Sequence, residues 1–480
     1  MAQKNPSISL FEALIPVIIL VLLLAFNVYV YGDDALSGSN QFILLIGAAV
    51  AAVVGFRIKV SYKAMLEAIG SNLKSTTGAI LILLFVGALA GTWLLSGIIP
   101  AMIYYGLQIL HPSIFLPACI VICAIISIAT GSSWTTSATV GIALIGIGRA
   151  LEIPVGMVAG AVISGAYFGD KLSPLSDTTN LAPAMAGTDL FTHIRYMSLT
   201  TIPSIVITLI VFLILGFFQQ TSGNADTQLL LDSIDERFTI NLGLFIVPLL
   251  VIVLIVRKAP PLVALMIGTL LGGIFALLYQ PHLVVETAGA AKLTLISAYR
   301  GVINAITVDN SIVTSNELLN DLFTSGGMQG MLGTIWLIIC AMVFGGIMDA
   351  IGGLQKLSHA LLAKAESTFQ LFAGTAASCI TINLTASDQY LSIVLPGKMF
   401  DQAYRDRGLA PENLSRTLED AGTVTSVLIP WNTCGAYQSG VLGVGVGEYF
   451  VFAIFNWLSP IMTLIYAYFG IKIKKLIPQE

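Results

Sequence analysis

The sequence has 480 residues, of which 56% are hydrophobic and only 10% are charged. Soluble domains are usually about 25% charged, so this composition excludes an ordinary soluble protein and indicates a chain largely embedded in a membrane. The formal net charge of -4 does not favour a nucleic-acid partner. The five cysteines include no CxxC pair, and we expect buried thiols rather than metal ligands or disulfides.

Long apolar runs predict the membrane spans, because roughly twenty apolar residues cross the hydrocarbon core. The first run, 11–31, is too long for the apolar part of a cleaved signal peptide, so it is predicted to be a span. The segment 60–77 alternates Lys with apolar residues and is expected to lie along the membrane interface. Further uninterrupted spans are predicted at 41–56, 79–99, 196–218, 238–256, 261–280, 331–351 and 449–470.

Four other apolar regions are interrupted by Gly, Pro, Ser, Thr, Asn or Asp. Lys and Arg favour the cytoplasmic ends of spans, and this rule orients the chain. The basic clusters fall on the inside if 116–148 and 368–400 are re-entrant hairpins while 154–190 and 415–447 are interrupted spans. This layout predicts ten crossings, with both termini in the cytoplasm.

The two halves share one order of elements: three spans, a hairpin, an interrupted span and one more span. At a shift of 255, Thr130 aligns with Thr385 and Ser132 with Ser387. Five crossings per half is an odd number, so the second half should be inverted. We therefore expect an all-α polytopic membrane protein with two inverted repeats, 1–220 and 238–480, which is a transporter architecture.

Polar stretches mark the tips of the hairpins and the breaks of the interrupted spans. Irregular backbone at membrane depth must be buried in protein or line a cavity, and inverted repeats can bring such breaks to one point. The stretches are "ATGSSWTTSATVG" (129–141), "GDKLSPLSDTTNLAP" (169–183), "NLTASDQYLS" (383–392) and "LEDAGTVTSVLIPWNTCGAYQSG" (418–440).

These stretches are rich in hydroxyl, amide and carboxylate oxygens, which suit a hard cation such as Na⁺. The predicted ion-binding residues are the carboxylates Asp177 and Asp388, with the oxygen donors Ser132, Ser133, Thr178, Asn180, Asn432 and Thr433. The candidate charge partners are Asp170, Lys171 and Asp420.

Other roles stay open for several of these residues. Lys171 could pair with Asp177, with a carboxylate of the other half, or with Asp170 in a structural ion pair. Asp388 could satisfy only the backbone donors of its hairpin. Asp420, beside Glu419, could simply favour a helix N-terminus.

The stretches "GSSWTTSATVG" and "GAYFGDKLSPLSDTTNLAP", with "IPWNTCGAY" later, resemble the NhaC-type Na⁺/H⁺ antiporter family within the ion transporter superfamily. The resemblance covers nearly the whole chain. It implies inverted repeats, each with a re-entrant hairpin and an interrupted helix, and exchange of Na⁺ for H⁺. Some relatives of similar sequence exchange organic acids such as malate and lactate, so the resemblance leaves the substrate open.

We predict a secondary active transporter that performs Na⁺/H⁺ antiport by alternating access in a bacterial-type inner membrane. No cofactor is expected, and the partners are the lipid bilayer and small ions or a small organic substrate; a homodimer is an open alternative. The alternative function is cation-coupled exchange of an organic or amino acid, favoured if Lys171 is buried and unpaired. An enzyme is disfavoured because the sequence has no metal motif, nucleophile elbow or phosphate loop.

Overall fold

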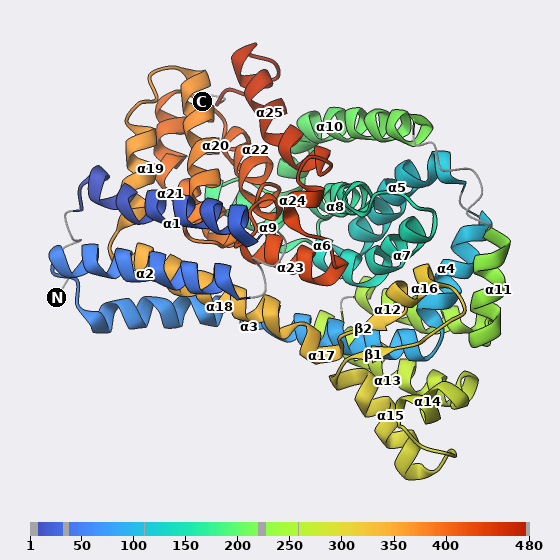
Figure 1. Ribbon diagram of the computed structural model, residues 1–480. Helices are drawn as coiled ribbons and strands as arrows, with labels where there is room; N and C mark the ends of the chain where they lie inside the picture. Colours follow the sequence, from blue (N-terminus) through green and yellow to red (C-terminus); the bar gives the residue numbers. More distant parts are fainter. Residues whose placement is uncertain (1–7, 32–37, 110, 219–226, 258, 477–480) are drawn as a thin grey trace.

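The computed structural model describes residues 8–31, 38–109, 111–218, 227–257 and 259–476. Helices dominate these ranges (Figure 1). Within them the only sheet is an antiparallel pair of two-residue strands, β1 (Asn310–Ser311) and β2 (Thr324–Ser325), in which Asn310 lies opposite Ser325. The prediction of an all-α polytopic membrane protein is confirmed at this level.

Seven of the described helices are long and apolar enough to cross a bilayer, and a bent pair would make an eighth. The pair comprises α11 (Thr227–Arg237), the 3₁₀ turn η3 (Leu242–Phe245) and α12 (Ile246–Val256), with a bend of 83°. The seven are α1 (Leu10–Tyr31), α2 (Ser39–Arg57), α3 (Tyr62–Leu95), α5 (Pro112–Thr130), α10 (Leu190–Phe218), α13 (Pro261–Tyr279), and α17 (Gly327–Gly330) continued by α18 (Leu332–Ala350).

Helix α3 differs from the prediction, because the structure does not separate 60–77 from the following span. The helix is continuous for 34 residues, and one cap begins it: the Ser61 hydroxyl accepts a hydrogen bond from the Ala64 N–H at 3.2 Å. Such a helix is about 50 Å long, which exceeds the ~30 Å hydrocarbon core. The helix must therefore tilt or project beyond the core. The last predicted span, 449–470, is shorter than expected and becomes α24 (Val446–Tyr449) and α25 (Ile454–Tyr468).

In the first half, helical geometry is interrupted twice within the irregular regions. Helix α5 ends at Gly131, whose φ of 70° is left-handed, and the chain becomes helical again after Ser132. The second break separates α8 (Val155–Leu172) from α9 (Asp177–Ala186). The neighbouring elements are α4 (Ile98–Ile109), α6 (Ser133–Thr136), the π-helical η2 (Ser137–Gly141) and α7 (Ile142–Ala150).

The second half is interrupted in the same order. Helices α20 (Thr368–Thr385) and α21 (Gln389–Asp406) pack against each other. Helix α22 (Pro411–Leu418) continues into the π-helical η4 (Glu419–Thr423) and the 3₁₀ turn η5 (Ser426–Leu428), and α23 (Thr433–Leu442) follows the break. Whether either hairpin enters and leaves on one side of the bilayer stays a prediction. The remaining helices are α14 (Pro281–Thr287), α15 (Leu295–Thr307), α16 (Glu317–Leu322) and α19 (Gly353–Leu362).

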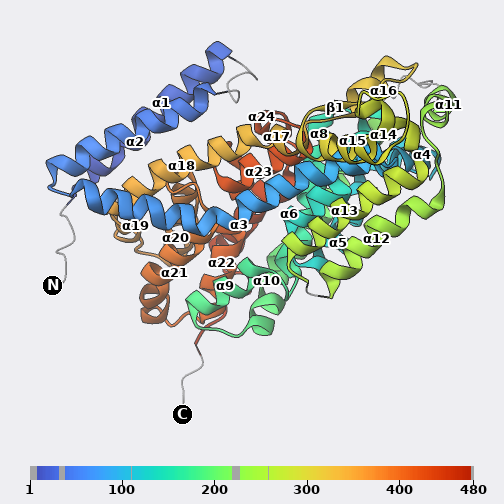
Figure 2. The same ribbon diagram turned by 90° about the horizontal axis from the view of Figure 1, so that it is seen from below.

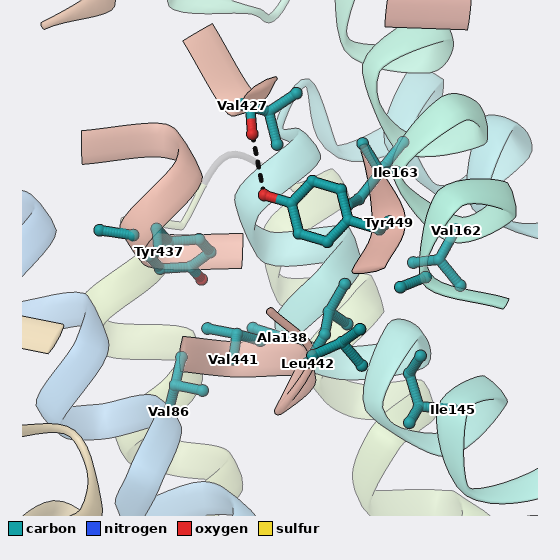
Figure 3. Close-up of a cluster of buried hydrophobic side chains, with 14 of the residues drawn as sticks. Val86, Ala138, Ile145, Val162, Ile163, Val427, Tyr437, Val441, Leu442 and Tyr449 are labelled. Carbon is teal, nitrogen blue, oxygen red and sulfur yellow. Dashed lines mark hydrogen bonds between the residues drawn. The ribbon is translucent and has the colours of Figure 1, made fainter. Parts of the chain in front are cut away.

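Figure 2 shows α3 and α18 side by side along much of the molecule, with α1 and α2 at one outer edge. A buried apolar cluster lies where elements of both halves meet (Figure 3). Inside it, the Tyr449 hydroxyl donates a hydrogen bond to the Val427 carbonyl oxygen at 2.8 Å, so its polar end is satisfied. The cluster includes Val86, Ala138, Ile145, Val162, Val441 and Leu442.

Helix α8 approaches α5 closely because two glycines one turn apart face it. A Cβ atom on Gly165 would lie 2.3 Å from the Ile120 carbonyl oxygen, and one on Gly169 would lie 2.4 Å from that of Ala124. Small residues spaced by four allow such backbone contact between membrane helices. The contact fixes the end of α8, and with it the break that follows.

We expect Gly165→Ala to lower the melting temperature of the detergent-purified protein. Overpacking costs about 1–3 kcal/mol, whereas the gain in helix propensity is about 1 kcal/mol. Gly70→Ala on α3 is the matched control, because no atom lies within 4 Å of its added Cβ. This control should be neutral or slightly stabilising. A melting temperature for Gly165→Ala at or above that of the native protein would contradict the packing argument.

Candidate cation-binding site

A cavity of about 540 Å³, here called the Asp177 cavity, is bounded by three of the four polar stretches. The tip of the first hairpin, the break between α8 and α9, and the start of α21 contribute to its wall. Helix α3 and the junction of α12 with α13 complete it. Its polar lining includes Ser132, Asp170, Ser176, Asp177, Thr178 and Gln389.

Two carboxylates line this cavity. Asp177 is exposed to it, whereas Asp170 is almost buried, with 8% of its surface exposed. Neither Lys nor Arg occurs among the lining residues that the structure describes. Oxygen donors with a local excess of negative charge suit a cation better than a free anion.

Asp170 anchors the tip of the first hairpin. Its Oδ2 atom accepts hydrogen bonds from the Ser133 N–H at 3.0 Å and from the Ser133 hydroxyl at 2.7 Å. Ser133 begins α6, where backbone N–H groups lack helical partners. The Ser132 hydroxyl caps the same helix by accepting from the Thr135 N–H at 3.1 Å. Of the two predicted serine donors, Ser132 reaches the cavity lining, whereas Ser133 is bound to Asp170.

The break between α8 and α9 satisfies its own backbone. The Thr179 hydroxyl lies 3.2 and 3.1 Å from two carbonyl oxygens at the end of α8 and can donate to either. The Asn180 amide donates to the carbonyl oxygens of Pro174 at 3.0 Å and Ser176 at 2.7 Å. Asn180 therefore holds the loop and lies outside the cavity lining, whereas Thr178 is part of it.

Lys171 forms a fully buried ion pair with Asp420 of η4. Its Nζ atom also donates to the Ser459 hydroxyl at 2.9 Å, and Asp420 accepts from the hydroxyls of Thr200, at 2.8 Å, and Thr463. Burial of a charge pair is costly unless its remaining hydrogen-bonding capacity is used, and these hydroxyls use it. The sequence left three pairings of Lys171 open, and the structure shows the one with a carboxylate of the other half.

Asp388 acts as a helix cap in this structure. Its Oδ1 atom accepts a hydrogen bond from the Leu391 N–H at 2.9 Å at the start of α21. The residue is 4% exposed and is not part of the lining of the Asp177 cavity, although Gln389 and Tyr390 are. The structure therefore does not place Asp388 in the cavity with Asp177. The second carboxylate of the lining is Asp170.

Asn432 and Thr433 tie the fourth break to the second hairpin. Asn432 caps α23 by accepting from the Cys434 N–H at 3.0 Å, and its amide donates to the Asn383 carbonyl oxygen at 3.1 Å. The Thr433 N–H donates to the Ser387 carbonyl oxygen at 3.0 Å. Neither residue lines the Asp177 cavity.

An aromatic stack joins the first hairpin to the fourth break. The rings of Trp134 and Tyr437 are stacked with centroids 4.0 Å apart, and the Tyr437 hydroxyl donates to the Trp134 carbonyl oxygen at 3.0 Å. All four breaks are thus linked, partly through the cavity and partly through direct contacts.

Two features of the site were not predicted from the sequence: the hydroxyl groups that bind Asp420, and the places of Gln389 and Tyr390 in the cavity wall. Ser459 and Thr463 are four residues apart in an apolar helix, so they lie on one helical face. That spacing was a usable signal of a buried polar contact. Gln389 and Tyr390 gave no comparable signal, because the direction of a side chain next to a break cannot be read from periodicity.

We expect Lys171→Met to destabilise the protein by about 3–5 kcal/mol, because it leaves Asp420 charged and unpaired in the interior. The double variant Lys171→Met/Asp420→Asn removes both charges and should regain much of the lost melting temperature. Lys63→Met, at an exposed ion pair with Glu67, is the control and should cost at most ~1 kcal/mol. A double variant as unstable as Lys171→Met would contradict this account.

Comparisons with known proteins identify the family of this chain. Residues 165–471 match the Na⁺/H⁺ antiporter family. The Na⁺/H⁺ antiporter NhaC of Alkalihalophilus pseudofirmus is 42% identical over 90% of both chains. The malate-2H⁺/Na⁺-lactate antiporter of Bacillus subtilis is 38% identical over 96% of this chain and 95% of that protein. The arginine/ornithine antiporter ArcD of Halobacterium salinarum is 34% identical over 100% of this chain and 95% of that protein.

The solved structure of MtrF from Neisseria gonorrhoeae covers 95% of each chain at 13% identity, with a TM-score of 0.38 that supports no argument about the fold. The family match covers more than half of the chain, and the relatives above span nearly all of it. The chain belongs to the Na⁺/H⁺ antiporter family.

Proposed function

We propose that the protein is a secondary active transporter that exchanges Na⁺ for H⁺ across a bacterial-type cytoplasmic membrane. The family supports antiport. The observation that carries the ion assignment is the Asp177 cavity, where Asp170 and Asp177 meet hydroxyl and amide oxygens and where no described lining residue is basic. Na⁺ and H⁺ are the transported ions, and no cofactor is required.

Competition of Na⁺ and H⁺ for the Asp177 carboxylate couples the movements of the two ions. Asp177 can bind Na⁺ only after it has released its proton, so each ion displaces the other. Ser132 and Thr178 would complete the coordination of Na⁺ from the same wall. Asp170 adds negative charge, although one of its oxygens is occupied by Ser133. The other predicted ligands, Asp388, Asn180, Asn432 and Thr433, would act by positioning the breaks through the hydrogen bonds described above.

We further propose that 1–220 and 238–480 are inverted repeats, and that the part bearing the hairpins moves against the remaining spans so that the site faces the two sides in turn. The positions of the helix caps support this arrangement. The C-caps of α5 and α20 are Gly131 and Ala386, which are 255 positions apart. The N-caps of α9 and α23 are Ser176 and Asn432, which are 256 positions apart. A duplicated unit would end and restart its helices at matching positions in this way.

Exchange of an organic or amino acid is the alternative function, since two relatives are named for such substrates. That alternative needs a cation for the substrate carboxylate, and Lys171 was its candidate. The Lys171 ammonium group is instead fully buried, paired with Asp420 and absent from the lining of the Asp177 cavity. This pairing supports ion exchange. Proteoliposomes with an internal pH dye, given Na⁺, Li⁺, K⁺, malate, lactate or arginine separately, test the choice.

We expect Asp177→Asn to abolish Na⁺-dependent proton movement in proteoliposomes while the protein still folds, because the substitution keeps the shape and removes the charge. Asp177→Glu should retain partial activity. In the native protein, apparent Na⁺ affinity should fall by up to about tenfold for each unit of decreasing pH, equivalent to about 1.4 kcal/mol, if one proton competes at one site.

Asp189→Asn is the control for Asp177→Asn. Asp189 is an exposed acid outside the cavity, bonded to the Thr192 N–H at 3.0 Å, and Asn can make the same bond. Its exchange activity should match that of the native protein. Normal pH-dependent Na⁺ exchange by Asp177→Asn would show that Asp177 is structural.

The proposed topology predicts opposite accessibility for two exposed positions. A cysteine replacing Asp232 should react with a membrane-impermeant maleimide in intact cells, whereas one replacing Arg405 should react only after permeabilisation. The five native cysteines are all buried and should give little background. Labelling of Arg405→Cys in intact cells would refute the layout with two re-entrant hairpins.

A further inference from the structure

A second cavity, of about 350 Å³ and here called the Arg149 cavity, lies beyond the Asp177 cavity along the same helix. It is bounded by the C-terminal part of α3, by α4 and α7, by the segment around β2 and by the end of α23. The proposed ion site does not use it. Its lining is mostly apolar and includes Val86, Ala90, Ile103, Ile145, Arg149 and Gly440.

Helix α3 lines both cavities with one of its faces. The residues that it contributes recur every three or four positions, which places them on a single side of the helix. They include Ser75, Ala79 and Ile82 in the Asp177 cavity, and Val86, Ala90 and Leu94 in the Arg149 cavity. From Ile82 to Val86 the helix rises only about 6 Å, so one helical turn separates the two cavities along α3.

A layer of buried side chains lies between the cavities. On the first hairpin, Trp134 lines the Asp177 cavity and Ile142 lines the Arg149 cavity. Ala138, midway between them in sequence, is buried. On α23, Val441 lines the Arg149 cavity, and Tyr437, one turn earlier, is fully buried and stacked on Trp134 (Figure 3). Helix α23 packs against both α3 and η2, and the two cavities are separate in this structure.

The two cavities face opposite sides of the membrane in the proposed topology. With the N-terminus in the cytoplasm, α3 is the third span, so its C-terminal end reaches the outer side. The Arg149 cavity takes its lining from that end and from α4, which follows it. The Asp177 cavity takes its lining from the earlier part of α3 and from the junction of α12 with α13. This junction contains Arg257, which the proposed topology places in the cytoplasm.

Arg149 gives the second cavity an electrostatic character unlike that of the first. Its Nη2 atom donates a hydrogen bond to the Gly443 carbonyl oxygen at 3.3 Å, which joins the end of α7 to the end of α23. Arg149 is the only charged residue among the lining residues that the structure describes. A fixed positive charge opposes the retention of a cation. The Arg149 cavity therefore suits the passage of Na⁺ better than its binding.

We propose that the Arg149 cavity is the outer vestibule of the ion pathway, and that the layer between Ile82 and Val86 separates it from the Asp177 cavity in the state seen here. The inference rests on the proposed Na⁺/H⁺ exchange and on the proposed topology. In this state the Asp177 site exchanges ions with the cytoplasm. Once the layer opens and the cytoplasmic side closes, ions reach or leave the same site through the vestibule.

Cysteine labelling tests which side each cavity faces. Ala79→Cys and Ala90→Cys place one thiol in each cavity, on the same face of the same helix, and both native alanines are half-buried. Intact cells receive a charged methanethiosulfonate, which does not cross the membrane. We expect Ala90→Cys to react much faster than Ala79→Cys in intact cells, and inside-out vesicles to reverse that order.

The effect of the label on transport connects the cavity with the pathway. Inside-out vesicles prepared from labelled Ala90→Cys cells should lose most of their Na⁺/H⁺ exchange relative to unlabelled cells of the same variant, and dithiothreitol should restore it. Reaction of Ala90→Cys with a lipid-soluble maleimide alone would show that the cavity faces lipid and would overturn the proposal. Complete labelling without any change in exchange would also overturn it. Labelling from outside, with no Na⁺-dependent proton movement in the native protein, would instead refute the proposed exchange.

Val86→Ser tests the position of the separating layer. The substitution replaces an apolar side chain of the layer with a smaller polar one, which weakens the barrier to water. Combined with Ala79→Cys, it should raise the rate of labelling from outside several-fold. Val53→Ser is the control, because Val53 lies on α2 and is 66% exposed, and it should leave that rate unchanged. An unchanged rate in a folded Val86→Ser variant would show that the layer lies elsewhere and would reject this part of the proposal.

Discussion

The need to satisfy broken backbone inside a membrane governs this structure. Helices that stop at membrane depth leave N–H and C=O groups without water as a partner, so side chains must replace it. Thr179 serves the end of α8, Asp170 serves the start of α6, and Asn432 joins α23 to the second hairpin. The groups that meet this need are the same hydroxyls, amides and carboxylates that can coordinate a cation. The breaks therefore concentrate ligands as a consequence of their own stabilisation.

The buried charges of this region also favour the binding of a cation. Three acids, Asp170, Glu419 and Asp420, are buried in this region with two cations, Lys171 and Arg416. Lys171 is committed to Asp420, and the Arg416 guanidinium lies against the ring of Tyr196. The remaining acids sit beside a cavity whose described lining has no basic residue. An acidic interior of this kind is most stable with protons or a metal cation bound. The preference for cations thus follows from the whole region rather than from one ligand.

Much of the fold was predictable because hydropathy alone identifies apolar spans, and the runs at 11–31, 41–56, 196–218, 261–280 and 331–351 each coincide with an apolar helix. The helix breaks were visible as polar stretches with Gly and Pro. The continuity of α3 was not predictable, since alternating Lys and apolar residues are compatible with either a separate surface segment or an extension of a span.

The details of the site were less predictable from the sequence. Asp177 stood out because its stretch is the most polar of the first half. That Asp170 and not Asp388 lines the cavity with Asp177 could not be foreseen, because both acids adjoin helix breaks and only the three-dimensional path decides which one lines it. The partner of Lys171 is 249 positions away, and local patterns carry no information about such a contact. Sequence reasoning named Asp420 among the candidate charge partners, but it could not choose among the pairings of Lys171 that it left open.

The contacts between the first hairpin, α8 and the second half differ greatly in strength, and this difference constrains how the molecule can move. Separation of Lys171 from Asp420 would leave two unpaired charges in the interior, at a cost of several kcal/mol. The stack of Trp134 on Tyr437 contributes only about 0.5–1.5 kcal/mol beyond the area that it buries, and the hydrogen bond between the two residues contributes about as much again. Together they cost less to break than the buried ion pair. Helix α8 and the segment around η4 should therefore travel as one rigid body, although they come from different halves of the chain. The boundary between moving parts would then follow the interface of the first hairpin with α23 rather than the boundary between the halves.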